Sequence, residues 1–196
     1  MQMVSGGASF TFRKLMIFID GSNFLGGVAD IKLKTGKVYK IDYPLLEQFL
    51  VGNASKDGLI RLEHIKTYFY GPKGVPEDLK SLKFGIQFSE QIEEFKNDLI
   101  KNHVRVILKD KIKNKEKGVD AALVTDFLSL AYSGAYDYAV LVSGDADFIS
   151  AIDEVKRYGK MISVICFESR FNEALTEHVD KVVFIPMDSN ILKELK

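Results

Sequence analysis

Several carboxylate side chains stand where regular elements of the predicted structure begin or end. They are Asp20, Asp120, Asp145 and Asp147. Asp20 directly follows the apolar run Leu15–Ile19, Asp145 lies just beyond the apolar run Tyr138–Val142, and Asp120 stands at the start of a predicted helix. In open α/β sheets, ligands bind at the carboxyl ends of the strands. These positions therefore predict that the four carboxylates gather at one edge of a sheet.

A cluster of this kind needs a countercharge. Each aspartate alone has an ordinary role, because Asp145 can cap its helix and Asp120 can face the positive end of a helix dipole. Like charges held close together, however, raise one another's pKa and destabilise the fold. A bound cation removes that cost, and oxygen ligands without cysteine or histidine favour Mg²⁺ or Mn²⁺ over zinc. We therefore predict a metal site formed by the four aspartates.

The chemistry that suits such a site is hydrolysis of a phosphate ester. A hard cation lowers the pKa of the water that it holds and offsets charge on the leaving oxygen. Asn23 and Ser143 stand beside the acids and can hold a water or a substrate oxygen without adding charge. Asp126 lies about 120° around its helix from Asp120, at 3.6 residues per turn. It is either a support for the site or a surface residue.

The elements that must position these residues alternate along the chain. Short, continuously apolar runs predict strands that are buried on both faces, as in a parallel sheet; they are Leu15–Ile19, Ile60–Tyr70, Val104–Leu108, Tyr138–Val142, Met161–Phe167 and Val182–Ile185. Helical patterns lie between them, over Pro44–Leu50, Ser81–Asn102, Val119–Tyr132 and Ala146–Tyr158. We predict an α/β fold with an open, mainly parallel sheet and helices on both faces, a three-layer sandwich.

Composition excludes several classes of protein. The chain has 196 residues, with 27 Lys+Arg against 27 Asp+Glu, so it is not a polybasic protein that binds nucleic acid through bulk charge. Its one cysteine, Cys166, lies in an apolar run and excludes a disulfide framework or a cysteine-rich zinc site. No apolar stretch reaches the ~18 residues of a membrane span. We therefore expect a cytoplasmic protein.

A lysine-rich segment leads into the helix that carries Asp120. Lysines occupy alternate positions from Lys109 to Lys117. One interpretation is a strand edge that lysines guard against unwanted pairing. The other is a basic finger that contacts phosphates, with Lys115 and Lys117 nearest the acids.

Three motifs together resemble a known family. Their letters are IFIDGSN (17–23), KGVD (117–120) and SGDADF (143–148). In order and approximate spacing they resemble the NYN domain, a branch of the PIN-like nuclease superfamily that includes the LabA-like proteins. The resemblance spans most of the chain, from Leu15 to Ile185.

That resemblance implies a metal-dependent ribonuclease. Asp20, Asp120 and Asp145 would be the core metal-binding acids for Mg²⁺ or Mn²⁺, and Asp147 would be a fourth ligand or would position water. Asn23 and Ser143 would give polar support next to the substrate. RNA would be the partner, and its hydrolysis would leave a 5′-phosphate and a 3′-hydroxyl.

Alternative functions remain at this point. A haloacid-dehalogenase-like phosphatase also begins with a strand that ends in Asp, but Ser22 stands where that family normally has a second Asp as general acid. The stronger alternative is a non-catalytic RNA- or protein-binding module that retains the fold. Overall neutrality favours the module, whereas the cost of keeping four acids together favours the nuclease.

We expect three segments along the chain. Residues 1–14 form a flexible leader, 15–186 the NYN/PIN-like domain, and 187–196 a tail or short helix. The last segment is expected to pack against the sheet edge or against a neighbouring subunit, which leaves a homo-oligomer open.

Overall fold

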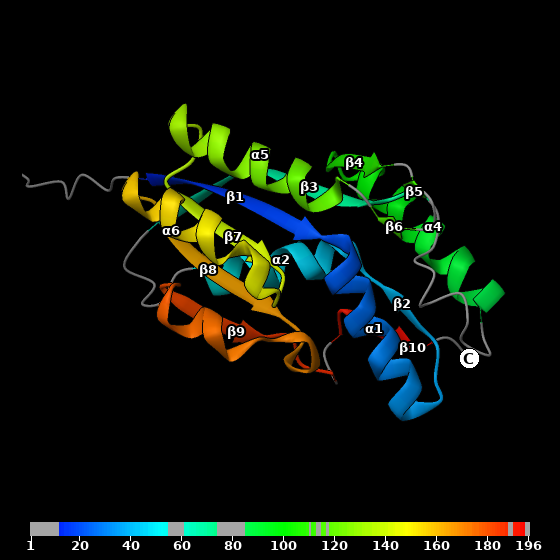
Figure 1. Cartoon of the computed structure of the whole chain (residues 1–196). Helices are drawn as coiled ribbons and strands as arrows, with labels where there is room; N and C mark the ends of the chain where they lie inside the picture. Colours follow the sequence, from blue (N-terminus) through cyan, green and yellow to red (C-terminus); the bar gives the residue numbers. More distant parts are fainter. Residues whose placement is uncertain are drawn as a thin grey trace, which may run out of the picture.

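A computed structural model describes residues 12–54, 61–73, 85–109, 111–112, 115–116, 118–187 and 190–194. Its centre is a six-stranded sheet in the order β4-β3-β1-β7-β8-β9, in which every neighbouring pair is parallel (Figure 1). The strands are β1 (Phe12–Asp20), β3 (Arg61–Pro72), β4 (Arg105–Lys109), β7 (Tyr138–Val142), β8 (Met161–Cys166) and β9 (Lys181–Phe184). The predicted parallel sheet is confirmed.

The strand order reverses direction at β1. From β1 the chain first adds β3 and β4 on one side, and later adds β7, β8 and β9 on the other. Asp20 is in register with Tyr70 of β3, and the preceding Ile19 is in register with Val142 of β7. Such a reversal is where open α/β sheets form their ligand sites, and Asp20 stands at its carboxyl end.

Helices cover both faces of the sheet. On one face lie α1 (Gly21–Thr35), α2 (Tyr43–Ala54) and α4 (Gly85–Lys101). On the other lie α5 (Val119–Tyr132) and α6 (Ile149–Arg157), which share the upper left of Figure 1. The predicted three-layer α/β architecture is therefore confirmed.

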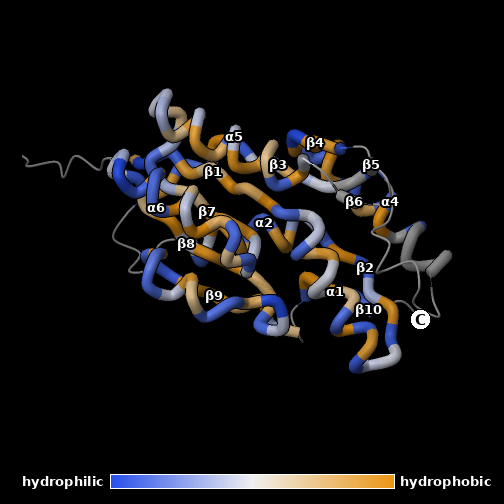
Figure 2. The backbone as a smooth tube through the Cα atoms, in the orientation of Figure 1, coloured by the Kyte–Doolittle hydropathy of each residue, from blue (hydrophilic) through white to orange (hydrophobic). Residues whose placement is uncertain are grey.

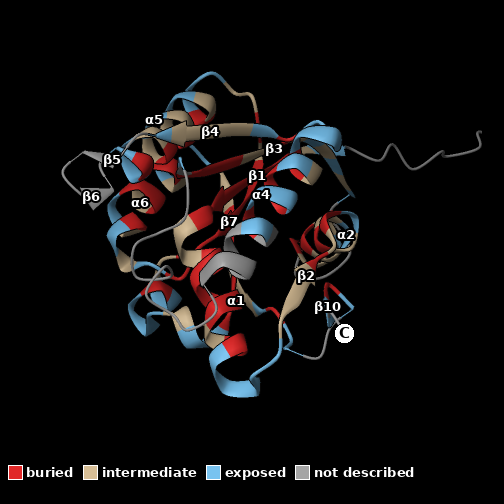
Figure 3. Cartoon of the chain, turned by 90° about the vertical axis from the view of Figure 1, so that its right-hand side faces the viewer, coloured by how far each residue is buried: buried red, intermediate tan, exposed pale blue. Residues whose placement is uncertain are grey.

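Each layer boundary has its own apolar core. Alternate side chains of β1 point to opposite faces, so Leu15, Ile17 and Ile19 join the core under α1, α2 and α4. Met16 and Phe18 join the core under α5 and α6. The strands β1, β7 and β8 are mostly orange in Figure 2, and Figure 3 shows the sheet interior in red with exposed outer helix faces in pale blue.

Helix α1 is an element that the sequence patterns did not predict. It contains three glycines and ends at Gly36, whose φ of 69° forms a left-handed cap. Glycines disfavour helices by about 1 kcal/mol each relative to alanine. Here they allow close packing, since a Cβ on Gly27 would lie 2.2 Å from the Phe167 ring. Tertiary contacts thus override a weak local preference.

Short elements complete the fold. The strand β2 (Tyr39–Ile41) pairs antiparallel with β10 (Leu192–Glu194), and β5 (Lys111–Ile112) pairs with β6 (Lys115–Glu116). Hence the described part of the expected tail contains a strand and not the short helix that we considered, because its backbone pairs with β2. Residues 12–14 of the expected leader belong to β1. The 3-10 helices are η1 (Ala146–Phe148), η2 (Glu168–Arg170) and η3 (Glu173–Glu177).

Cys166 closes β8 as a buried thiol. It is 2% exposed, and burial raises its pKa to about 12. The thiol is therefore protonated near neutral pH and packs as a small apolar group. Among the described residues, no helix combines the length and apolar character needed to cross a membrane.

Candidate active site

Asp20 lies buried at the carboxyl end of β1. It is only 4% exposed, and its side chain caps α1. The Oδ1 atom accepts hydrogen bonds from the backbone N–H groups of Ser22 and Asn23 at 3.1 and 3.2 Å. The Oδ2 atom accepts the Ser143 hydroxyl at 2.8 Å. The carboxylate at the end of β1 thus contacts Ser143, which follows the neighbouring strand β7.

The environment of Asp20 disfavours the ionised form of its carboxyl group. Its pKa is raised from 3.8 to about 6, chiefly because burial disfavours the charged form. The hydrogen bonds from Ser143 and Asn23 lower the pKa, while the negative charges of Asp120 and Asp145 raise it. Three of the predicted acids therefore interact through their fields. A cation at this place would offset both the cost of burying the charged carboxylate and its repulsion by Asp120 and Asp145.

The turn after β7 is locked to the start of α1. The backbone N–H of Gly144 donates to Oδ1 of Asn23 at 3.1 Å, and the N–H of Asp145 donates to the Ser143 hydroxyl at 3.2 Å. Ser143 is fully buried. Asn23 and Ser143, predicted as polar support, thus hold the backbone that carries Asp145 in addition to any role toward a substrate.

The other predicted acids are exposed. Asp145 caps η1, where its Oδ1 accepts the Asp147 N–H at 2.9 Å. Asp120 lies in the first turn of α5, whose preceding residue Gly118 adopts a left-handed φ of 89°. Asp147 is also exposed, on η1. Two of these exposed carboxylates, those of Asp120 and Asp145, act on the buried Asp20 through their charge.

The donor set fits a hard cation held loosely. Among the residues that the structure describes, no three carboxylate, histidine or cysteine side chains are grouped closely enough to hold a metal together. Magnesium, however, keeps several waters and is commonly bound through one or two carboxylates. The oxygen-only chemistry and the raised pKa of Asp20 fit such a cation. At most two of Asp20, Asp120 and Asp145 would bind the cation directly, and the rest would hold it through its waters.

An open hollow lies beside Asp145. Its volume is about 600 Å³, and its walls include Asn23, Asp145, Arg170 and Asn172. The predicted basic residues add little detail here, because Lys117 lies outside the described residues and only the backbone of Lys115, in β6, is described.

Two side chains near the site have roles that sequence patterns did not establish. Asp126, which we placed either at the site or on the surface, accepts a hydrogen bond from the buried Tyr70 hydroxyl at 2.9 Å. Arg170 forms a two-pronged ion pair with Asp30 of α1 at 2.7 and 2.8 Å. Gly26 and Gly27 of α1 were the sequence feature that could have indicated close packing against this helix.

Comparisons with known proteins agree with this geometry. A family model described as the NYN domain matches residues 14–188. No curated protein matches the chain. A solved structure that is similar, with a TM-score of 0.61, is a protein of unknown function from Vibrio parahaemolyticus; it is 19% identical, and the match covers 93% of this chain and 96% of that chain. At that identity the likeness shows the fold alone.

Proposed function

Since the chain belongs to the NYN domain family, within the PIN-like nuclease superfamily, we propose that it is a metal-dependent ribonuclease. The observation that supports this most directly is the buried Asp20 at the reversal point of the sheet, with its pKa raised to about 6 beside Asp120 and Asp145. A binding module gains nothing from a carboxylate that is both buried and repelled. A hydrolase that uses a cation does.

Each residue has a defined part in this proposal. Asp20, Asp120 and Asp145 would hold Mg²⁺ or Mn²⁺ directly or through its waters, and Asp147 would be a fourth ligand or would position water. When bound, the cation supplies water activation and offsets charge on the phosphate. Asn23 and Ser143 fix the backbone of Gly144 and Asp145, and Asn23 also lines the hollow.

The substrate that we propose is RNA, which would enter along the hollow next to Asp145. Lys115 and Lys117 would contact its phosphates from the lysine-rich segment. Hydrolysis would leave a 5′-phosphate and a 3′-hydroxyl. We further propose a cytoplasmic location, which the protonated, buried thiol of Cys166 suits, and leave open assembly into a homo-oligomer.

The test is cleavage of labelled single-stranded and hairpin RNA with Mn²⁺, Mg²⁺ or EDTA. Wild type is compared with Asp20→Asn and Asp145→Asn, and circular dichroism checks that each variant is folded. Asp98→Asn is the matched control, because α4 ends just before β4 and so places Asp98 toward the amino edge of the sheet. Cleavage that requires metal and is lost in both site variants, but not in the control, supports the proposal.

Other outcomes contradict it. Equal cleavage by Asp20→Asn and wild type would refute the assignment of Asp20. If no form cleaves RNA but the wild type binds it, the chain is a binding module that retains the family fold.

A further inference from the structure

Four residues of α1 form a stripe that faces η2. Asn23, Gly26, Gly27 and Asp30 are spaced at i, i+3, i+4 and i+7, so they lie on one side of the helix. The Arg170 guanidinium lies on this stripe. A Cβ on Gly26 would be 2.9 Å from the Arg170 Cζ atom, so only glycine admits the side chain without a shift.

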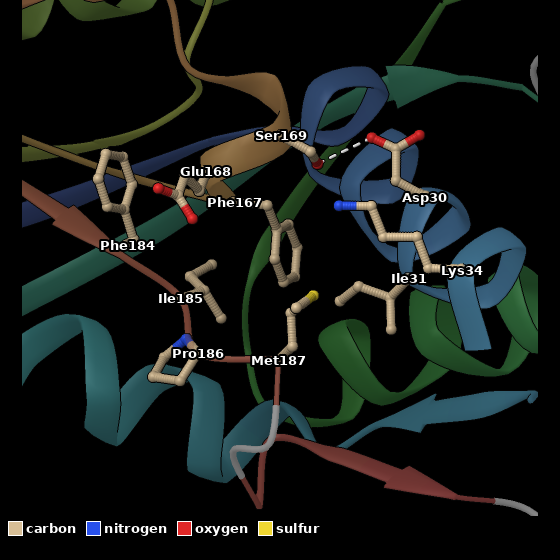
Figure 4. A pocket seen from close by; sticks show the side chains of 10 residues that line it. All are labelled: Asp30, Ile31, Lys34, Phe167, Glu168, Ser169, Phe184, Ile185, Pro186 and Met187. Atoms are coloured by element: carbon tan, nitrogen blue, oxygen red, sulfur yellow. Dashed lines mark hydrogen bonds between the residues drawn. The ribbon is translucent and has the colours of Figure 1, made fainter.

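The Arg170 side chain binds α1 through its Nε and Nη2 atoms. Its Nε donates to Oδ2 of Asp30 at 2.7 Å and its Nη2 donates to Oδ1 of Asp30 at 2.8 Å. The same Nη2 also donates to the carbonyl oxygen of Gly26 at 3.2 Å. Ser169 reinforces the pair, since its hydroxyl donates to Asp30 at 2.9 Å, the dashed line in Figure 4. Such planar, two-pronged pairing is specific to arginine.

The backbone of Arg170 presses on the turn that carries Asp145. A Cβ on Gly144 would lie 2.1 Å from the Arg170 carbonyl oxygen and 2.7 Å from the Phe171 Cα. The Asn172 N–H donates to the Gly144 carbonyl oxygen at 2.9 Å. From the other side, Asn23 accepts the Gly144 N–H. The turn is therefore held between α1 and the segment 170–172.

We propose that Arg170 is a positioning residue, which ties the segment 170–172 to α1 and so fixes the Gly144 turn and Asp145 relative to Asp20. This inference rests on the proposed nuclease function for its kinetic consequence. It assigns to Arg170 a role different from RNA binding, because its guanidinium already binds Asp30 and Gly26.

Two variants separate positioning from RNA binding. Arg170→Lys keeps the positive charge but loses the planar fork, and Asp30→Asn removes the partner's charge while freeing the arginine. If Arg170 positions Asp145, both variants lower kcat by about 10- to 100-fold, the scale of a small displacement of reacting groups, with KM and RNA affinity unchanged. Arg157→Lys on an exposed part of α6 and Asp98→Asn at a half-buried position of α4 are matched controls and keep wild-type kcat.

An RNA contact predicts the opposite pattern. Asp30→Asn, which frees the arginine, would then strengthen RNA binding with a steeper dependence on salt, and kcat would stay at the wild-type value. Strengthened binding of this kind, or unchanged kcat in both variants, overturns the proposal. So does a loss of kcat that only follows a loss of overall stability measured by urea unfolding.

Hydrogen exchange distinguishes failure of this inference from failure of the proposed function. We expect faster amide exchange over residues 143–147 in both variants, with β1 unchanged, whether or not the wild type cleaves RNA. If wild type is inactive and exchange is faster, the nuclease proposal fails while the positioning role stands. Unchanged exchange overturns the positioning role.

Discussion

Replacing Asp20 by asparagine should stabilise the metal-free protein at neutral pH, although it removes the central acid of the proposed site. Asparagine has nearly the same shape and is an equally good helix cap, so its Oδ1 can still accept the N–H groups of Ser22 and Asn23. What it lacks is the charge that is buried beside Asp120 and Asp145.

The magnitude follows from the raised pKa. A carboxyl whose pKa rises from 3.8 to about 6 on folding costs the fold about 3 kcal/mol once it is ionised, since one pH unit corresponds to about 1.4 kcal/mol. The Ser143 hydroxyl loses its acceptor in Asp20→Asn, and its rearrangement offsets about 1 kcal/mol. We expect a net gain of about 2 kcal/mol, or roughly 4–8 °C in Tm for a chain of this size.

The pH dependence has a definite sign. Because the pKa of Asp20 is raised in the folded state, the folded protein holds this proton more tightly than the unfolded chain does. The contribution is fully present below about pH 4 and is lost as the pH rises through about 6. Wild type should therefore lose stability over this range, while Asp20→Asn lacks this part of the decline.

The assay is thermal unfolding in EDTA from pH 4 to 8, with Asp98→Asn as the control for the same chemical change at a partly exposed site. Adding Mg²⁺ or Mn²⁺ at pH 7.5 should stabilise wild type by mass action and leave Asp20→Asn unchanged. If Asp20→Asn has a lower Tm than wild type at pH 7.5 in EDTA, or if the difference does not change with pH, burial of a charged Asp20 is refuted.

Three further substitutions probe the site and the core. Ser143→Ala removes the hydroxyl that donates to Asp20. The free energy of unfolding, measured in urea, should fall by about 2 kcal/mol at pH 8 and by less at pH 5, where the carboxyl is protonated. A loss that does not depend on pH would contradict this. Gly144→Ala places a Cβ 2.1 Å from the Arg170 carbonyl oxygen, so we expect lower stability and lost cleavage, and wild-type values for both would show that the turn can move freely. Phe18→Ala removes a fully buried ring, and urea unfolding should show a loss of about 3–5 kcal/mol, whereas a loss under 1 kcal/mol would mean that the core collapses to fill the space.

The sheet and the positions of the acids could be predicted because they depend on local patterns. Buried parallel strands are continuous apolar runs, and an aspartate directly after such a run has to lie at the carboxyl edge. Hence Leu15–Ile19 and Tyr138–Val142 both lie within observed strands, and Asp20 and Asp145 follow them. The solvent exposure of each acid could not be predicted, since burial of Asp20 and exposure of Asp145 depend on packing.

Elements that depend on distant partners were missed. Helix α1 has poor local signals because Gly26 and Gly27 are selected for close contact with Arg170 and Phe167, which follow them by well over a hundred residues. The pairing of β2 with β10 joins three-residue segments from opposite parts of the chain. No window of neighbouring residues contains that information.

The lone thiol at the end of β8 makes the molecule its own reporter of opening. A thiol-modifying reagent attacks the thiolate, and Cys166 is both 2% exposed and protonated, with a pKa of about 12. Labelling in the folded state must therefore wait until β8 separates from its neighbours. The chain contains no other cysteine. The rate at which the reagent is incorporated, measured by mass spectrometry, therefore reports how often the β7–β8–β9 part of the sheet opens, without any engineered probe.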